Sequence, residues 1–131
     1  MSQENVEAVQ RAFAEFEKGT FWVPEFFDPS VRIEWLDAVG TESETVGLQA
    51  MSDFMKNWLE VHDNLTLTAE RIIDAGDQVV VFATWGGRGK ASGVPTEWRH
   101  GQVWTMRDGK ATGVMSYRDP AEALEAAGVS E

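Results

Sequence analysis

Two side chains in this sequence are candidates for a general acid or base, His100 and Asp119. An unperturbed imidazole has a pKa near 6.5, so His100 could move a proton at neutral pH. A lone histidine in a strand also fits a core or interface position. Asp119 opens the run Asp-Pro-Ala-Glu, which is typical of a helix start with Asp as the N-cap. The cap explains Asp119 without chemistry, because a general acid also needs burial or a partner that shifts its pKa.

The composition excludes several other kinds of site. The chain has no cysteine, which removes disulfides, thiolate metal sites and a cysteine nucleophile. His62 and His100 lie far apart without paired acidic spacing, so no metal is expected. The glycines at 86–89 open no helix and resemble no phosphate loop, and no cofactor is expected. The formal net charge of −11 argues against binding to nucleic acid or to an acidic membrane surface. The N-terminal residues do not resemble a signal peptide, and the chain is expected to be cytoplasmic.

Apolar periodicity predicts the elements that must position these side chains. Helical stripes cover residues 2–18 and 47–61, and strand patterns cover 31–36, 65–73, 78–85, 97–106 and 110–118. Residues 38–45 are predicted to be a polar loop, and 86–93 fit neither pattern. Helices followed by consecutive strands indicate an α+β fold with a mainly antiparallel sheet. We expect a single domain over residues 1–131.

The sequence resembles SnoaL-like proteins of the nuclear transport factor 2-like (NTF2-like) superfamily. The similarity rests on an opening helix, a helix-to-strand junction, a further helix and two strand-turn segments. These are residues 2–13, 27–31, 46–51, 73–81 and 104–110, and the tail at 121–128 completes the match. The resemblance implies a cone in which a curved, mainly antiparallel sheet packs against N-terminal helices. It does not imply one activity, because the fold hosts isomerases, hydrolases, cyclases and proteins that only bind.

The catalytic residues of these relatives are mostly replaced. Where ketosteroid isomerases carry a tyrosine, a general-base Asp and an oxyanion-binding Asp, this sequence has Ala12, Trp35 and Gln102. If two residues are inserted, Asp37 resembles the isomerase base instead. Polyketide cyclases of the SnoaL type carry an Asp where Asp119 stands, but their partner histidine falls at Gln102. The family pairs are therefore broken.

The resemblance places one face of the strand 97–106 toward a pocket. Trp98, His100, Gln102, Trp104 and Met106 alternate on that face. His100 and Gln102 are expected to lie about 7 Å apart, so that both reach one ligand without touching each other. Further ligand-binding candidates are Trp35, Trp58, Ser116 and Arg118. The alternative is that the tryptophans simply fill the core.

Two functions follow from this pattern. In one, the chain is a small-molecule-binding domain with an aromatic-lined hydrophobic pocket. In the other, it is a small lyase, isomerase or cyclase for a hydrophobic carbonyl compound, with His100 or Asp119 as acid or base. We also expect a homodimer through the outer face of the sheet. We expect that face to consist of the odd-numbered residues of 97–105 together with Val79, Val81, Ala83 and Trp85.

Overall fold

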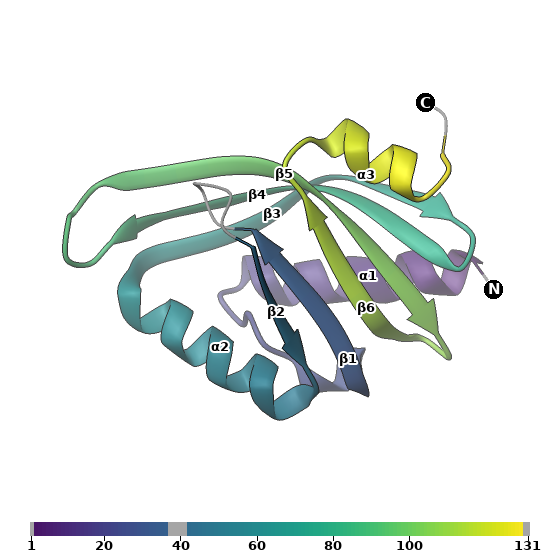
Figure 1. Cartoon of the computed structure of the whole chain (residues 1–131), viewed down its shortest axis with the longest axis horizontal. Helices are drawn as coiled ribbons and strands as arrows, with labels where there is room; N and C mark the ends of the chain where they lie inside the picture. Colours follow the sequence, from purple (N-terminus) through teal and green to yellow (C-terminus); the bar gives the residue numbers. More distant parts are fainter. Residues whose placement is uncertain (1, 37–41, 130–131) are drawn as a thin grey trace.

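The computed structural model describes residues 2–36 and 42–129 as three α-helices, a 3₁₀ turn and one curved six-stranded sheet (Figure 1). The helices are α1 (Ser2–Glu17), α2 (Leu48–Val61) and α3 (Pro120–Ala126), and η1 is Pro24–Phe26. The strands are β1 (Phe27–Leu36), β2 (Glu42–Val46), β3 (His62–Ala75), β4 (Gln78–Gly89), β5 (Pro95–Arg107) and β6 (Lys110–Tyr117). Their order in the sheet is β2-β1-β6-β5-β4-β3, with β1 and β6 parallel and the other neighbours antiparallel. The α+β prediction is confirmed.

Both long helices follow from their apolar stripes. Val9, Ala12, Phe13 and Phe16 are buried along one face of α1, at the spacing of a 3.6-residue period. The chain leaves α1 at Gly19, whose φ of 94° suits a residue without a Cβ. The buried residues of α2, Met51 and Met55, are separated by one turn. The predicted ranges for these helices agree with the structure to within one residue at each end.

The strands are longer than the sequence pattern predicted. Residues 86–89, which fitted no pattern, continue β4 and pair with β5 as far as Pro95. Residues 42–46 form β2, although 38–45 were predicted to be a loop. β2 is a short polar strand at the edge of the sheet. Its composition does not indicate a strand, and its extended conformation is held by pairing with β1. Residues 37–41 of that predicted loop lie outside the described residues.

The sheet separates two cores of unequal size. The helices α1 and α2 pack on its inner face, and α3 lies on the opposite, outer face (Figure 1). Beneath α3, Val80, Phe82 and Val103 enclose Ala123. Gly101 permits this close approach, because a Cβ built at that position would lie 2.6 Å from the Cβ of Ala123.

The structure corrects the predicted faces of β4. Val79, Val81, Ala83 and Trp85 belong to the inner core and not to the outer face. The register explains this, because Val81 pairs with Gln102 and Trp85 pairs with Trp98. Directly paired residues of an antiparallel sheet share a face. The inward-facing residues of β5 therefore place these four residues inward as well.

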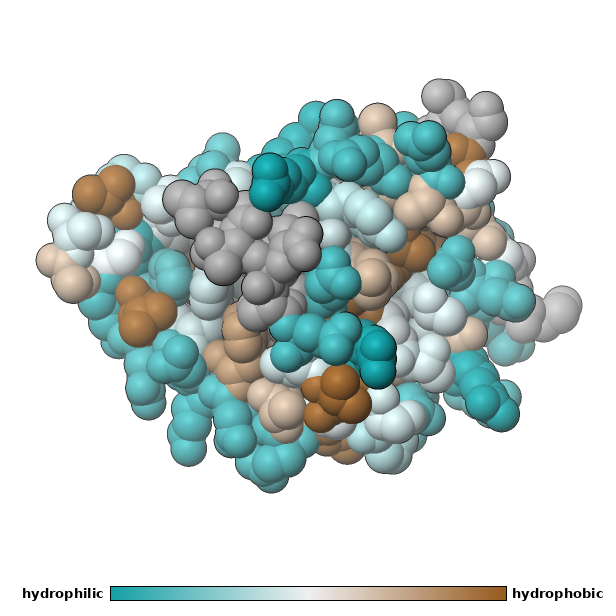
Figure 2. Space-filling view, viewed as in Figure 1, coloured by the Kyte–Doolittle hydropathy of each residue, from teal (hydrophilic) through white to brown (hydrophobic). Residues whose placement is uncertain are grey.

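The described surface carries few large apolar side chains. The exposed ones are Val46, Leu59, Val61 and Val94. The face in Figure 2 is mostly hydrophilic, with hydrophobic side chains in separate spots. None of the described helices has the length and the apolar composition that a membrane span requires.

Candidate pocket on the inner face of the sheet

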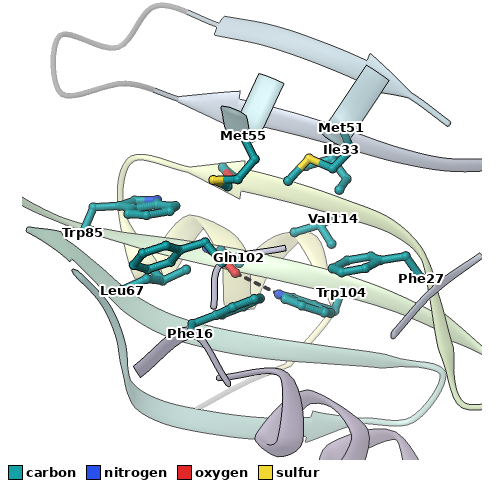
Figure 3. A pocket seen from close by; sticks show the side chains of 12 residues that line it. Phe16, Phe27, Ile33, Met51, Met55, Leu67, Trp85, Gln102, Trp104 and Val114 are labelled. Atoms are coloured by element: carbon teal, nitrogen blue, oxygen red, sulfur yellow. Dashed lines mark hydrogen bonds between the residues drawn. The ribbon is translucent and has the colours of Figure 1, made fainter. Parts of the chain in front are cut away.

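A hollow lies between the inner face of the sheet and the helices α1 and α2. It encloses about 420 Å³ of space outside the atoms, part of which is open to solvent. The centre of a water molecule could occupy about 30 Å³ of it, so a larger ligand requires side chains to move. The lining residues are Phe16, Phe21, Phe27, Ile33, Met51, Met55, Leu67, Trp85, Gln102, Trp104, Val114 and Ser116 (Figure 3).

Aromatic rings form much of the pocket wall. The ring of Trp104 lies 5.6 Å from that of Phe27 and 5.9 Å from that of Phe13, measured between centroids. Trp85 lies 6.1 Å from Phe21. Figure 3 shows Met51 and Met55 reaching toward these rings from the opposite side. Methionine side chains are flexible, so this wall can adapt to a ligand more readily than the aromatic wall.

Three polar side chains of β5 form a hydrogen-bonded chain beside the pocket. The indole N–H of Trp104 donates to Oε1 of Gln102 at 2.8 Å. The Gln102 amide nitrogen lies 2.9 Å from Nε2 of His100. An indole N–H can only donate, so Oε1 must face Trp104 and the NH₂ group must face His100. Nε2 of His100 is then the acceptor, and the neutral ring carries its proton on Nδ1.

The surroundings of His100 favour this neutral form. The side chain is 3% exposed. Burial lowers the pKa of His100 to about 4, because the charged imidazolium would lose its hydration, and the nearby backbone of Trp98 opposes part of this change. Nδ1 nonetheless makes no hydrogen bond of good geometry with a described residue. A protonated ring would also present a donor to the Gln102 NH₂ group, so protonation breaks the chain.

This contact corrects the expected separation of His100 and Gln102. About 7 Å separates the backbones of alternate strand residues, but both side chains lean along the strand and bridge that distance. Gln102 is therefore bonded to two protein groups. Ser116 pairs with Gln102 across β5 and β6 and lines the pocket beside it.

Trp58 and Trp98 lie behind Trp85, outside the lining. The ring of Trp85 is 6.1 Å from that of Trp58 and 6.2 Å from that of Trp98. The rings of Trp58 and Trp98 are 6.2 Å apart with an angle of 74° between their planes. Both indole N–H groups are buried and neither has a hydrogen-bond partner in the described part of the chain. These two candidates border the pocket through Trp85.

The remaining candidates lie elsewhere. Asp119 is exposed, and its carboxylate accepts from the Ala121 N–H at 2.9 Å as the N-cap of α3. Arg118 is exposed and outside the lining. The side chain of Trp35 falls outside the described part of the structure. Of the predicted site residues whose side chains the structure describes, only Gln102, Trp104 and Ser116 line the pocket, and His100 is hydrogen-bonded to Gln102.

Sequence reasoning missed Trp85 as a pocket residue. A signal for it exists: the odd positions from Val79 to Trp85 are all apolar, whereas the even positions include Gln78 and Thr84. The more apolar set of a strand belongs in the larger core. Met51 and Met55 lay on the predicted helical stripe, but nothing in the stripe distinguishes pocket from core.

The described lining can bury a ligand and hydrogen-bond to it, but it contains no titratable side chain. Its polar groups are the amide of Gln102, the hydroxyl of Ser116 and the indole N–H groups of Trp85 and Trp104. Within residues 2–36 and 42–129, no three His, Cys, Asp or Glu side chains are grouped as metal ligands would be. The arrangement suits recognition of a mainly apolar molecule.

Residues 6–114 match the model of the SnoaL-like domain, so the chain belongs to the SnoaL-like family. An NTF2-like protein of unknown function from Burkholderia pseudomallei has a similar structure (TM-score 0.75, 20% identity), with 93% of this chain and 95% of that chain covered. A putative SnoaL-like polyketide cyclase from Jannaschia is also similar (TM-score 0.73, 22% identity, 99% and 95% covered). TerC, co-crystallised with polyporic acid, is a third (TM-score 0.71, 24% identity, 95% and 98% covered). No curated protein sequence matches the chain.

Proposed function

We propose that this protein binds a small, hydrophobic, flat or cyclic organic molecule in the pocket between α1, α2 and the inner face of the sheet. The observation that carries the proposal is a hollow whose described lining residues are all apolar or aromatic except for two neutral polar ones, Gln102 and Ser116. Such pockets recognise ligands by burying apolar surface and use a few polar groups for orientation. The co-crystallisation of TerC with polyporic acid supports the use of this fold for small-molecule binding.

A titration with tetralin, a two-ring hydrocarbon, tests this proposal. The methyl groups of Met51 and Met55 line the pocket, so their NMR signals report on its occupancy. We expect saturable shifts of these two signals in the wild-type protein. No saturable shift at the solubility limit of tetralin would contradict the proposal.

Filling the pocket supplies the matched variant. Val114→Phe adds an aromatic ring to the lining, whereas Val46→Phe adds the same ring at a position that is 53% exposed. We expect tetralin binding to be lost in the first variant and retained in the second. Retained dispersion of the amide signals shows that Val114→Phe is folded, because overpacking of this kind costs about 1–3 kcal/mol.

Catalysis by a lyase, isomerase or cyclase mechanism finds less support. It requires a group that moves a proton, and neither candidate reaches the described pocket surface. Asp119 is a helix cap, and Nε2 of His100 is occupied by Gln102. Binding is therefore the function that the geometry supports best.

A homodimer and a cytoplasmic location stay predictions. The four β4 residues assigned to the dimer face point into the core, so any contact on the outer face would use its polar residues and the surface around α3. Light scattering at tens of micromolar measures the mass directly. A monomeric mass would contradict the dimer.

A further inference from the structure

Two neighbouring tryptophans at the end of the pocket carry hydrogen-bond donors without acceptors. The Nε1 atoms of Trp58 and Trp98 are buried, and neither has a partner in the described structure. Trp58 comes from α2 and Trp98 from β5, and their rings are in edge-to-face contact. A third donor is Nδ1 of His100, the next inward-facing residue of β5, which makes no hydrogen bond of good geometry and has only the nearby backbone of Trp98 as a poorly aligned partner. Most buried polar groups in proteins are satisfied, so two unpaired donors and a poorly paired third on the same side of the sheet require an explanation.

All three groups are donors, and this restricts what could satisfy them. An indole N–H has no acceptor capacity, and the tautomer of His100 is fixed by Gln102 and Trp104. A water molecule would accept from them but would bring two protons of its own. The rings around Trp58 are those of Phe54, His62, Trp85 and Trp98, and Nδ1 of His62 already lies 3.0 Å from the backbone oxygen of Trp58. No orphan acceptor is found among the described buried side chains. Buried water usually needs about three hydrogen bonds, so this position suits an oxygen that only accepts.

We propose that the Trp58–Trp98 pair, with His100 beside it, is a subsite for an acceptor oxygen of the ligand, such as a ketone, quinone or carboxylate oxygen. This inference rests on the proposed function, because the ligand body would occupy the pocket, and the Trp85 ring that separates the pocket from both tryptophans would turn aside to let the oxygen reach them. Trp58 and Trp98 are only half-buried, so their rings have room to turn and open the subsite. The apolar lining then selects the carbon skeleton, and the donor cluster selects the oxygen.

A pair of probes isolates the oxygen. 1-Tetralone and tetralin share one two-ring skeleton and differ in a single carbonyl group. We expect 1-tetralone to bind at least fivefold more tightly than tetralin, and the indole N–H proton signals of Trp58 and Trp98 to move downfield only with 1-tetralone. Trp58→Phe and Trp98→Phe identify these signals, because each variant removes one of six indole resonances.

The same variants remove the donor and keep an aromatic ring. Each should reduce the preference for 1-tetralone over tetralin at least threefold while tetralin affinity stays within twofold. Trp22→Phe is the matched control, since Trp22 stacks on Phe27 away from the donor cluster, and it should keep the preference. The melting temperature of each variant confirms folding.

The outcomes separate this inference from the function on which it rests. If both probes bind equally, or if the variants weaken both probes alike, the subsite is overturned and the pocket stands. Indole signals that do not move with 1-tetralone overturn it as well, since the N–H groups would then be satisfied by water or by facing rings. If neither probe binds, the proposed function fails and the subsite with it.

Discussion

The two faces of β5 treat polar side chains in opposite ways. On the inner face, Trp104, Gln102 and His100 are buried and bonded in series. On the outer face, the guanidinium of Arg99 pairs with Glu70 at 3.1 Å, and both side chains are largely exposed. Arg99 also lies over the ring of Phe82, 5.8 Å from its centroid. One strand thus holds a water-excluded chain on one side and a solvated network on the other.

The two faces of β5 should differ in the energetic cost of removing one partner of a hydrogen bond or ion pair. A buried group that loses its partner keeps the full cost of lost hydration, whereas an exposed group regains water. Inner-face residues should therefore be strongly interdependent, and outer-face residues nearly independent. The predictions below test that contrast, beginning with the largest effect.

Gln102→Leu should lower the free energy of unfolding by about 2–5 kcal/mol, because it strands both the Trp104 N–H and Nε2 of His100 in a buried site. Urea denaturation measures this value. Gln78→Leu is the control, since Gln78 donates to Thr105 in a half-buried setting on the next strand, and it should cost less than about 1 kcal/mol. Equal losses in the two variants would refute the contrast.

Acidification should destabilise the protein through His100. Its folded pKa of about 4 lies below the unfolded value of about 6.5, so the unfolded chain binds more protons between these two values. Stability attributable to His100 is therefore present above pH 6.5 and declines as the pH falls toward 4. The full loss is on the order of 3 kcal/mol.

Denaturation curves at pH 7, 6, 5 and 4.5 measure this dependence. His100→Asn should flatten the curve between pH 7 and 5. Carboxylates contribute in both backgrounds, so the difference between variant and wild type isolates His100. Parallel curves for wild type and His100→Asn would contradict the predicted pKa.

Gly101→Ala tests the dry contact under α3. The new methyl group would lie 2.6 Å from the Cβ of Ala123 and 2.9 Å from the Cα of Pro120, so α3 must move. We expect a loss of about 1–3 kcal/mol and faster amide exchange in α3. Gly113→Ala is matched, because its Cβ would meet its nearest atom at 3.5 Å, and it should be close to neutral. Unchanged exchange in α3 would show that the helix is not held by this contact.

Arg99→Ala should have the smallest effect, below about 1 kcal/mol, because the Glu70 pair is exposed and screened. A double-mutant cycle with Glu70→Ala measures the coupling, which should shrink further at 0.5 M salt. A coupling above 2 kcal/mol would show that the outer-face residues depend on one another as strongly as the inner-face residues do.

Sequence patterns predicted the helices and the course of most strands because their signals are local. The stripe from Val9 to Phe16 and the break at Gly19 determine α1 without reference to the rest of the chain. The Asp108-Gly109 turn similarly indicates the β5–β6 hairpin, and both residues have positive φ. The inward face of β5 followed from alternation once a family resemblance supplied the direction.

What escaped prediction depends on neighbours distant in sequence. Both the odd-numbered and the even-numbered residues of Val79–Phe82 are apolar, so alternation does not show which of them face inward. The register of β4 with β5 decides this. β2 has no apolar run and is ordered by its pairing with β1. The hydrogen bond between His100 and Gln102 depends on side-chain directions that spacing alone does not specify.

The parallel pairing of β1 and β6 determines when the pocket can form during folding. Ile33 pairs directly with Val114, and both residues line the pocket. Contacts between distant parts of a chain form slowly, because a long loop must close first. β6 is the last of the six described strands along the chain. The helix α1 packs chiefly on β3 and can be covered earlier, but the part of the pocket wall between Ile33 and Val114 forms only after β6 has been synthesised.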